Sequence, residues 1–347
     1  MEWSVLEKYR ENGYINIDKF LEDNKDIADT IFREVRGSEN REKDWITIGD
    51  VDILLRTENL IDEEVYNTSF AELLTEEVAK QVGIEAAHYD LITYKGEKGV
   101  LSQSVLKEDE SLINMSTVLT NLGNYENIED TLDFIDFEEV LLAIKKLKDC
   151  EECITKEDML KMQEDFCKIV VFDIFSMNTD RNGQNFSIIS SKDSYRIAPI
   201  YDNEHSFGGG LDKETIERIN SDNVEAKKIS ELLLPVLEAS GECTMDITQN
   251  WKDYSPREDE KYNIPFNWQT LIFAIGEDLE NENVSDFFIN CFKNINISKA
   301  FSAVEERIGI KIPPEYKESV EKIYNERKKY INDALILEEL EEEIEEI

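Results

Sequence analysis

Three side chains near the middle of the chain have the types and the spacing needed for phosphoryl transfer. Asp180 is followed by Asn185 after five residues and by Asp202 after twenty-two. Such a transfer needs a carboxylate that accepts or orients the proton of the attacking hydroxyl, and oxygen atoms that hold Mg²⁺ against the phosphates. The alternative interpretation is that Asp180 and Asn185 merely cap a loop and that Asp202 caps a turn.

Two linked motifs surround this set. They are Asn178-x-Asp180-Arg181-x-Gly-x-Asn185 and Ala198-Pro-x-Tyr-Asp202-Asn203-x-x-Ser-Phe207. In protein kinases the base and the amide ligand are also five residues apart, and the second acidic ligand follows a short hairpin. The motifs resemble those of the HipA-like serine/threonine kinases of bacteria. The resemblance extends more loosely from about Val35 to Gly210.

The resemblance implies a role for each motif residue. Asp180 would be the catalytic base, and Arg181 would support the catalytic loop by pairing with a carboxylate. Asn185 and Asp202 would hold Mg²⁺. The implied cofactors are ATP and Mg²⁺, and the implied reaction is in-line transfer of the γ-phosphoryl group to a Ser or Thr hydroxyl.

The resemblance also implies residues that bind the nucleotide through a strand lysine paired with a helix glutamate. Arg56 stands where the family has this lysine, and Glu72 falls at the partner position. Arg binds phosphate with a geometry different from that of a compact ammonium, so the departure indicates weakened catalysis or a pseudokinase. Two alternatives remain open: Glu72 forms a capping box with Ser69, and Arg56 is an ordinary strand residue.

Two loops complete the implied nucleotide site. Gly37 and Ser38 lie in a segment that resembles the phosphate-side loop, in which a Ser of the family is autophosphorylated. Lys107 lies in a segment that resembles the hinge between the lobes, where backbone groups would bind adenine. A plain surface loop and a solvated lysine are the competing interpretations.

The elements that must position these residues change character along the chain. Residues from about 35 to 106 are strand-rich, with predicted hairpins over 45–55 and 90–105 and a helix over 70–82 that stops at Gly83. Helical patterns then dominate, over 137–148, 156–176, 223–234, 267–278, 284–294, 297–308 and 314–331. A short hairpin is predicted between Asn185 and Asp202.

This pattern predicts an α+β, bilobal protein-kinase-like fold. We expect an N-terminal lobe over 1–106, a helical catalytic lobe over 107–337 and an acidic tail over 338–347 that is a solvated helix or a frayed end.

Composition narrows the possible partners. The chain has 347 residues, with 38 Lys and Arg against 78 Asp and Glu, and hence a net charge of −40. We therefore expect no direct binding of nucleic acid or of an anionic membrane. The expected partner is a protein substrate, and the negative net charge favours one that is basic. Two His exclude a His-rich metal site, and five scattered Cys indicate reduced thiols in the cytoplasm. The N-terminus lacks the features of a signal peptide. We expect no antitoxin partner of the HipB type, because the chain is too short to include the extra N-terminal domain of HipA toxins.

Three functions from different classes fit these observations. The first is a HipA-like Ser/Thr protein kinase, for which the complete set of Asp180, Asn185 and Asp202 argues. The second is a kinase-fold enzyme that phosphorylates a small-molecule or lipid hydroxyl. The third is a binding protein, either a nucleotide-binding pseudokinase or an acidic decoy, for which Arg56 and the net charge argue.

Overall fold

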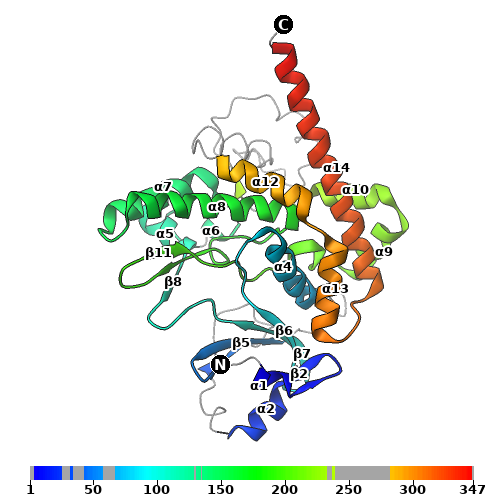
Figure 1. The fold of residues 1–347 in the computed structure, drawn as a ribbon. Coiled ribbons are helices and arrows are strands. Elements are labelled where there is room, and N and C mark those ends of the chain that lie inside the picture. Colours follow the sequence, from blue (N-terminus) through cyan, green and yellow to red (C-terminus); the bar gives the residue numbers. More distant parts are fainter. Residues whose placement is uncertain are drawn as a thin grey trace. The chain divides into compact units, whose positions relative to one another are not determined.

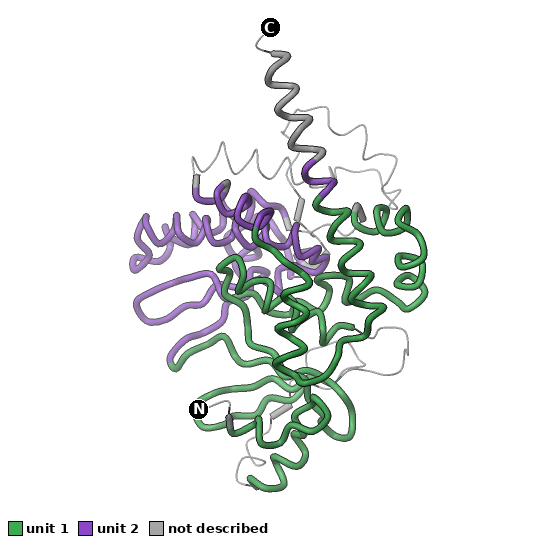
Figure 2. Tube along the Cα trace, turned by 45° about the vertical axis from the view of Figure 1, so that its right-hand side comes forward, with its two compact units in different colours: residues 1–108, 199–232, 294–328 green, residues 109–198, 233–293, 329–347 purple. Residues whose placement is uncertain are grey.

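The described residues of the chain form two units. A computed structural model describes residues 4–25, 32–33, 43–57, 67–128, 130–133, 135–232, 237–238 and 282–345 (Figure 1). Unit 1 consists of residues 1–108, 199–232 and 294–328, and unit 2 consists of residues 109–198, 233–293 and 329–347 (Figure 2). The first segment of unit 1 ends close to the predicted lobe boundary at residue 106. Unit 1 also includes two later segments, and the lobe extents given above stay a prediction.

Unit 1 contains a seven-stranded sheet. Its strands are β1 (Arg10–Glu11), β2 (Tyr14–Asn16), β3 (Phe32–Arg33), β4 (Lys43–Ile48), β5 (Val51–Thr57), β6 (Tyr89–Tyr94) and β7 (Glu97–Gln103), in the order β1-β2-β6-β7-β5-β4-β3. Both predicted hairpins are confirmed as the antiparallel pairs β4–β5 and β6–β7. Gly96 turns the second hairpin with a φ of 80°, in the left-handed region that favours glycine.

The helices of unit 1 come from all three of its chain segments. They are α1 (Ser4–Glu7), α2 (Ile17–Asp23), α4 (Thr68–Val82), the 3₁₀ helix η1 (Ser206–Gly208), α9 (Lys213–Ser221), α10 (Asn223–Leu232), α13 (Ile297–Ile308) and the first part of α14 (Pro314–Glu345). The remainder of α14 belongs to unit 2 and carries the predicted acidic tail as a helix as far as Glu345.

Helix α4 confirms most of its sequence prediction. Its apolar positions are buried, and Gly83 ends it with a φ of 82°. The predicted capping box is wrong, because Asn67 occupies the N-cap position and Ser69 already lies inside the helix. The carboxylate of Glu72 is turned inward instead, to partners described below.

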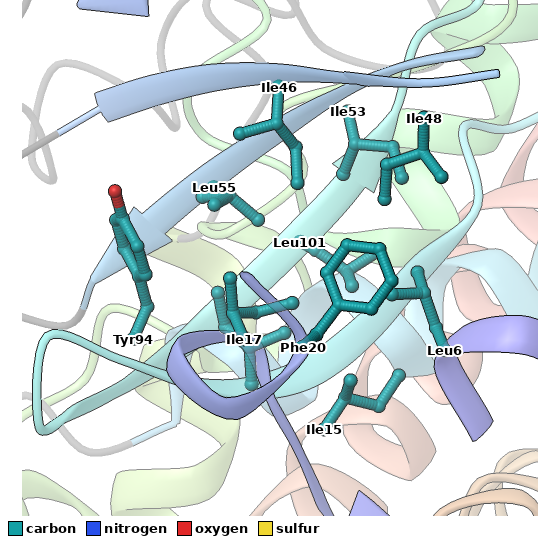
Figure 3. Close-up of a cluster of buried hydrophobic side chains, with 11 residues drawn as sticks. Leu6, Ile15, Ile17, Phe20, Ile46, Ile48, Ile53, Leu55, Tyr94 and Leu101 are labelled. Atoms are coloured by element: carbon teal, nitrogen blue, oxygen red, sulfur yellow. The ribbon is translucent and has the colours of Figure 1, made fainter. Parts of the chain in front are cut away.

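One face of the β4–β5 hairpin supplies the core of the sheet. The core positions alternate along the two strands and are at most 3% exposed: Ile46, Ile48, Ile53 and Leu55. Their side chains gather with Phe20 of α2 (Figure 3). Because successive strand residues point to opposite faces, Lys43 and Arg56 lie on the other face of this hairpin.

Unit 2 is mainly helical. Its elements are β8 (Ser111–Asn114), α5 (Met115–Leu122), α6 (Asp130–Asp133), β9 (Ile135–Asp136), α7 (Phe137–Cys150), α8 (Lys156–Ser176), β10 (Ser187–Ser190), β11 (Tyr195–Ile197), β12 (Leu237–Glu238) and α12 (Glu282–Asn294). Strands β10 and β11 form the predicted short hairpin, which β8 extends to three strands. The helix predicted over 267–278 lies outside the described residues.

Helix α8 leads directly into the predicted catalytic loop. It begins at the predicted residue, where Thr155 and Asp158 form a capping box. It ends at Met177, whose φ of 56° breaks the helical path while its N–H still donates to the carbonyl of Asp173. The side chains that follow are thereby fixed to the end of a buried helix.

No disulfide bond joins the cysteines of the described residues. Cys150, Cys153, Cys167 and Cys291 are free thiols. Within the described ranges, no helix has the length and apolar content to cross a bilayer.

A buried carboxylate ties α4 to the rest of unit 1. Glu76 is 2% exposed. Its Oε1 lies 2.7 Å from His88 Nδ1, and its Oε2 accepts from Arg307 of α13 at 2.9 Å. Burial acts to raise the pKa of Glu76, but the hydrogen bond to His88 and the charge of Arg307 lower it to about 2.

We expect this carboxylate to make the chain sensitive to acid. The pKa is lower in the folded state, so the stabilisation is fully present above about pH 4.5, the unfolded value, and is lost as the pH falls towards 2. Glu76→Gln should therefore lower the free energy of unfolding by about 3 kcal/mol at pH 7, and by progressively less below pH 4.5. Urea unfolding across this pH range measures both values.

Glu85→Gln is the matched control for this experiment. Glu85 is an exposed glutamate of the same unit. Its substitution should change the free energy of unfolding by less than about 0.5 kcal/mol at every pH. A difference between wild type and Glu76→Gln that stayed constant from pH 7 to pH 3 would contradict the assignment.

Candidate active site

The loop after α8 brings the first two predicted site residues together. The Nδ2 of Asn185 donates to Asp180 Oδ2 and to the Asp180 carbonyl, each at 2.9 Å. Asn182 Nδ2 donates to Asp180 Oδ1, also at 2.9 Å. The carboxylate of Asp180 is thus oriented by two amides within its own loop.

Arg181 anchors this loop to α8. Its guanidinium is 2% exposed and pairs with Asp173 at two points, Nε to Oδ2 at 2.9 Å and Nη2 to Oδ1 at 3.1 Å. Its Nη1 donates to the carbonyl of Asn185 at 3.0 Å. The predicted pairing of Arg181 with a carboxylate is confirmed. The partner was not predicted, although an Asp within the apolar run Val170-Val-Phe-Asp-Ile-Phe175 is a buried charge that needs a cation.

Gly183 fixes the far side of the loop against α5 and α6. Its N–H donates to the carbonyl of Thr131 at 3.1 Å, and its carbonyl accepts from the N–H of Ser116 at 2.8 Å. A Cβ at this position would lie 2.9 Å from Thr131 Oγ1 and would overlap Ser116 Oγ. These two hydroxyls are hydrogen-bonded to each other at 2.6 Å, so neither can move aside freely. Residue 183 must therefore lack a side chain.

We expect Gly183→Ala to lower the free energy of unfolding by about 1–3 kcal/mol, because the added methyl group overpacks the contact with Ser116. The same substitution in a Ser116→Ala background should cost less, since the overlapping hydroxyl is gone. Urea unfolding of the four proteins of this cycle measures the difference. Equal costs in both backgrounds would show that Ser116 does not constrain the loop.

The third predicted site residue belongs to unit 1. Asp202 has a φ of 53°, a left-handed conformation that Asp tolerates better than most residues. Its N–H donates to the hydroxyl of Tyr89 at 2.9 Å, and its Oδ1 accepts from Arg56 Nη1 at 2.5 Å. Tyr89, a buried residue of β6, was not predicted as part of the site. The left-handed conformation of Asp202 is a form of backbone strain, and strain of this kind is concentrated at functional sites in proteins.

Arg56 and Glu72 form the ion pair that the resemblance implied. Arg56 Nη2 lies 2.6 Å from Glu72 Oε1, and both residues are buried. Glu72 Oε2 accepts from the N–H of Asn203 at 2.7 Å. A third carboxylate that the sequence analysis missed, Glu204, lies 3.5 Å from Arg56 Nη1. The pairing is confirmed as geometry, and the nucleotide-binding role of both residues stays a prediction.

The charges of this cluster act on one another. Burial raises the pKa of Glu72 to about 7; Arg56 opposes this shift, and the carboxylates of Asp202 and Glu204 add to it. Burial acts in the same direction on Asp202, but the guanidinium of Arg56 and the ammonium of Lys43 hold the pKa of Asp202 below its ordinary value. Asp202 is therefore charged at neutral pH, as a metal ligand must be.

The free atoms of the predicted metal ligands suit Mg²⁺. Asn185 uses its Nδ2 for Asp180 and Asp202 uses its Oδ1 for Arg56, which leaves Asn185 Oδ1 and Asp202 Oδ2 without a hydrogen bond within the described part of the chain. Among the described residues, no group of three or more His, Cys, Asp or Glu could hold a metal. Mg²⁺ typically takes only one or two protein ligands beside phosphates and water, and oxygen ligands of this kind fit it.

The remaining predicted residues are less informative. Gly37 and Ser38 lie outside the described residues. Lys107 is exposed in the segment that follows β7. Its predicted role at a hinge stays a prediction.

Comparison with known proteins finds a family model that covers the residues of this candidate site. The family model of the HipA-like C-terminal domain matches residues 40–228, which is more than half of the 347-residue chain. That range includes Arg56, Glu72, Asp180, Asn185 and Asp202. A search of the curated proteins finds no match.

Two solved structures are similar to the chain. The proinflammatory kinase CtkA of Helicobacter pylori is 17% identical, with a TM-score of 0.60, over 86% of this chain and 93% of that one. A chain from the complex of the toxin–antitoxin system HipA and HipB with its operator DNA, from Shewanella oneidensis MR-1, is 12% identical, with a TM-score of 0.48, over 86% of this chain and 65% of that one. The likeness to CtkA confirms the predicted fold class, an α+β bilobal kinase-like fold. On the match over residues 40–228, the chain belongs to the HipA-like C-terminal domain family.

Proposed function

We propose that the chain is an ATP- and Mg²⁺-dependent kinase that transfers the γ-phosphoryl group to a Ser or Thr hydroxyl of a protein. The observation that carries the proposal is the loop in which Asn185 Nδ2 donates to Asp180 Oδ2 at 2.9 Å. One hydrogen bond orients the carboxylate and directs the amide oxygen of Asn185 away from it. These are the two tasks that a catalytic loop must combine.

In this proposal Asp180 accepts or orients the proton of the attacking hydroxyl. Arg181 holds the loop rigid through its two-point contact with the buried Asp173. Asn185 and Asp202 would hold Mg²⁺, which supplies positive charge against the phosphates when bound. Positioning and charge neutralisation account for most of the expected rate enhancement.

The charge of the chain supports a particular kind of protein substrate. A net charge of −40 attracts basic segments and repels nucleic acid and anionic lipid surfaces. We propose a substrate whose Ser or Thr lies in a basic segment, with the enzyme acting in the cytoplasm. A lipid head group is the less favoured acceptor for the same electrostatic reason.

One observation favours a second candidate, a nucleotide-binding pseudokinase. Arg56 stands in place of the expected lysine, and its Nη1 lies 2.5 Å from Oδ1 of the proposed metal ligand Asp202. A guanidinium in this position competes with Mg²⁺ for one of the two carboxylate oxygens. Such a chain would bind ATP but transfer its phosphoryl group slowly or not at all.

The two candidates are separated by phosphoryl transfer from labelled ATP. The substrates are the chain itself and a basic Ser-containing protein, and intact mass with peptide mapping detects the product. Asp180→Ala should lower the rate at least about 10²-fold with little change in ATP affinity, because it removes a group needed only in the transition state. Asp202→Ala should also lose the Mg²⁺ dependence of ATP binding.

Asp193→Ala is the matched control, since Asp193 is an exposed carboxylate in the β10–β11 turn. It should transfer label at the wild-type rate. Tight Mg²⁺-dependent ATP binding without transfer by the wild type would establish the pseudokinase. Transfer by Asp180→Ala at the wild-type rate would show that the assignment of the base is wrong.

A further inference from the structure

Strand β4 carries a second cation, Lys43, directly opposite Arg56 of strand β5. Strands β4 and β5 are antiparallel, and Lys43 is the direct partner of Arg56 in their register. Directly opposed residues of an antiparallel pair point to the same face, with their Cβ atoms about 5 Å apart. The hydrogen bond from Thr47 Oγ1 to Asp52 Oδ1, 2.6 Å long, shows this arrangement at another pair on that face.

The positive charge of Arg56 is already compensated by neighbouring carboxylates. Its Nη2 is paired with Glu72, its Nη1 is paired with Asp202, and Glu204 lies 3.5 Å from Nη1. Three carboxylates therefore surround one guanidinium that is only 8% exposed. To bind a phosphate directly, Arg56 would have to release carboxylates that are buried with it.

Lys43 differs from Arg56 in each of these respects. It is partly exposed, and no carboxylate of the described chain lies within ion-pair distance of its ammonium. Its position nevertheless brings it to the site, because it lies directly opposite Arg56, whose Nη1 donates to Asp202 Oδ1 at 2.5 Å. Because Asp202 would hold Mg²⁺ for the phosphates in the proposed function, a cation beside this residue is placed to bind phosphate as well.

We propose that Lys43 supplies the ammonium that contacts the β- and γ-phosphates of ATP, and that Arg56 is a positioning residue that holds Asp202 and Glu72. This inference rests on the proposed nucleotide binding. The ligand class is a nucleoside di- or triphosphate, because a nucleoside monophosphate lacks the groups that the ammonium would contact. The lysine that the family resemblance places on β5 is thereby replaced from the neighbouring strand.

Calorimetric titration with MgATP, MgADP and AMP tests this assignment. Lys43→Met keeps most of the apolar stem and removes the charge. It should weaken the binding of MgATP and MgADP about tenfold or more and leave the affinity for AMP within about twofold, since only the first two carry a β-phosphate. Lys43→Arg should restore part of the loss. Unchanged AMP binding also shows that the variant is folded.

Lys8→Ala is the control for the loss of one positive charge, because Lys8 is an exposed lysine of the same unit. It should leave all three affinities unchanged. If the wild type binds MgATP and Lys43→Met binds it equally well, the assignment of Lys43 is wrong while the proposed function stands. If Lys43→Met weakens AMP as much as ATP, Lys43 has a structural role and the assignment is wrong. If the wild type binds none of the three, the proposed function and this inference both fail.

Discussion

The ion pairs of the buried Arg56 guanidinium are the interactions on which the candidate site residues of unit 1 depend. It joins three parts of the chain that are distant in sequence: strand β5, helix α4 through Glu72, and the segment after Ile200 through Asp202 and Glu204. Removing the guanidinium would leave three carboxylates without the partner that they share, and breaking buried pairs of this kind typically costs about 3–5 kcal/mol. A single side chain therefore links the helix, the strand and the strained turn at Asp202.

The same physical solution recurs in unit 2 with different residues. Arg181 and Asp173 are both almost completely buried and meet at two points, so each offsets part of the desolvation penalty of the other. In both units a buried arginine pairs with a carboxylate at or near a proposed catalytic or metal-binding residue. Guanidinium suits this purpose better than ammonium, because its planar donors can hold two acceptors in a fixed geometry.

The site residues that sequence reasoning predicts are those whose signal lies in a short motif, and their roles stay a prediction. Asp180, Asn185 and Asp202 are of this kind, and the hairpin between them was also predicted from a local pattern. Their supporting residues were missed where the contact joins distant positions, as with Tyr89, which lies 113 residues before Asp202. Periodicity predicts which face of a strand is buried, but it does not identify the partner of a polar group on that face.

The one clear error shows how tertiary contacts override a local motif. Ser69 and Glu72 have the spacing of a capping box, yet the Glu72 carboxylate binds Arg56 and the N–H of Asn203 instead. A capping interaction contributes about 1 kcal/mol at a solvated helix end, whereas the buried cluster would lose several if this carboxylate left it. The stronger interaction determines the conformation.

The discontinuity of unit 1 has a consequence for the order of folding. Arg56 meets Asp202 only after 146 further residues, and Glu76 meets Arg307 after 231. During synthesis these two ion pairs can therefore form only after residues 202 and 307 have left the ribosome. Loop closure over such separations slows folding, and the contacts around Asp202 are among the later features of unit 1 to form.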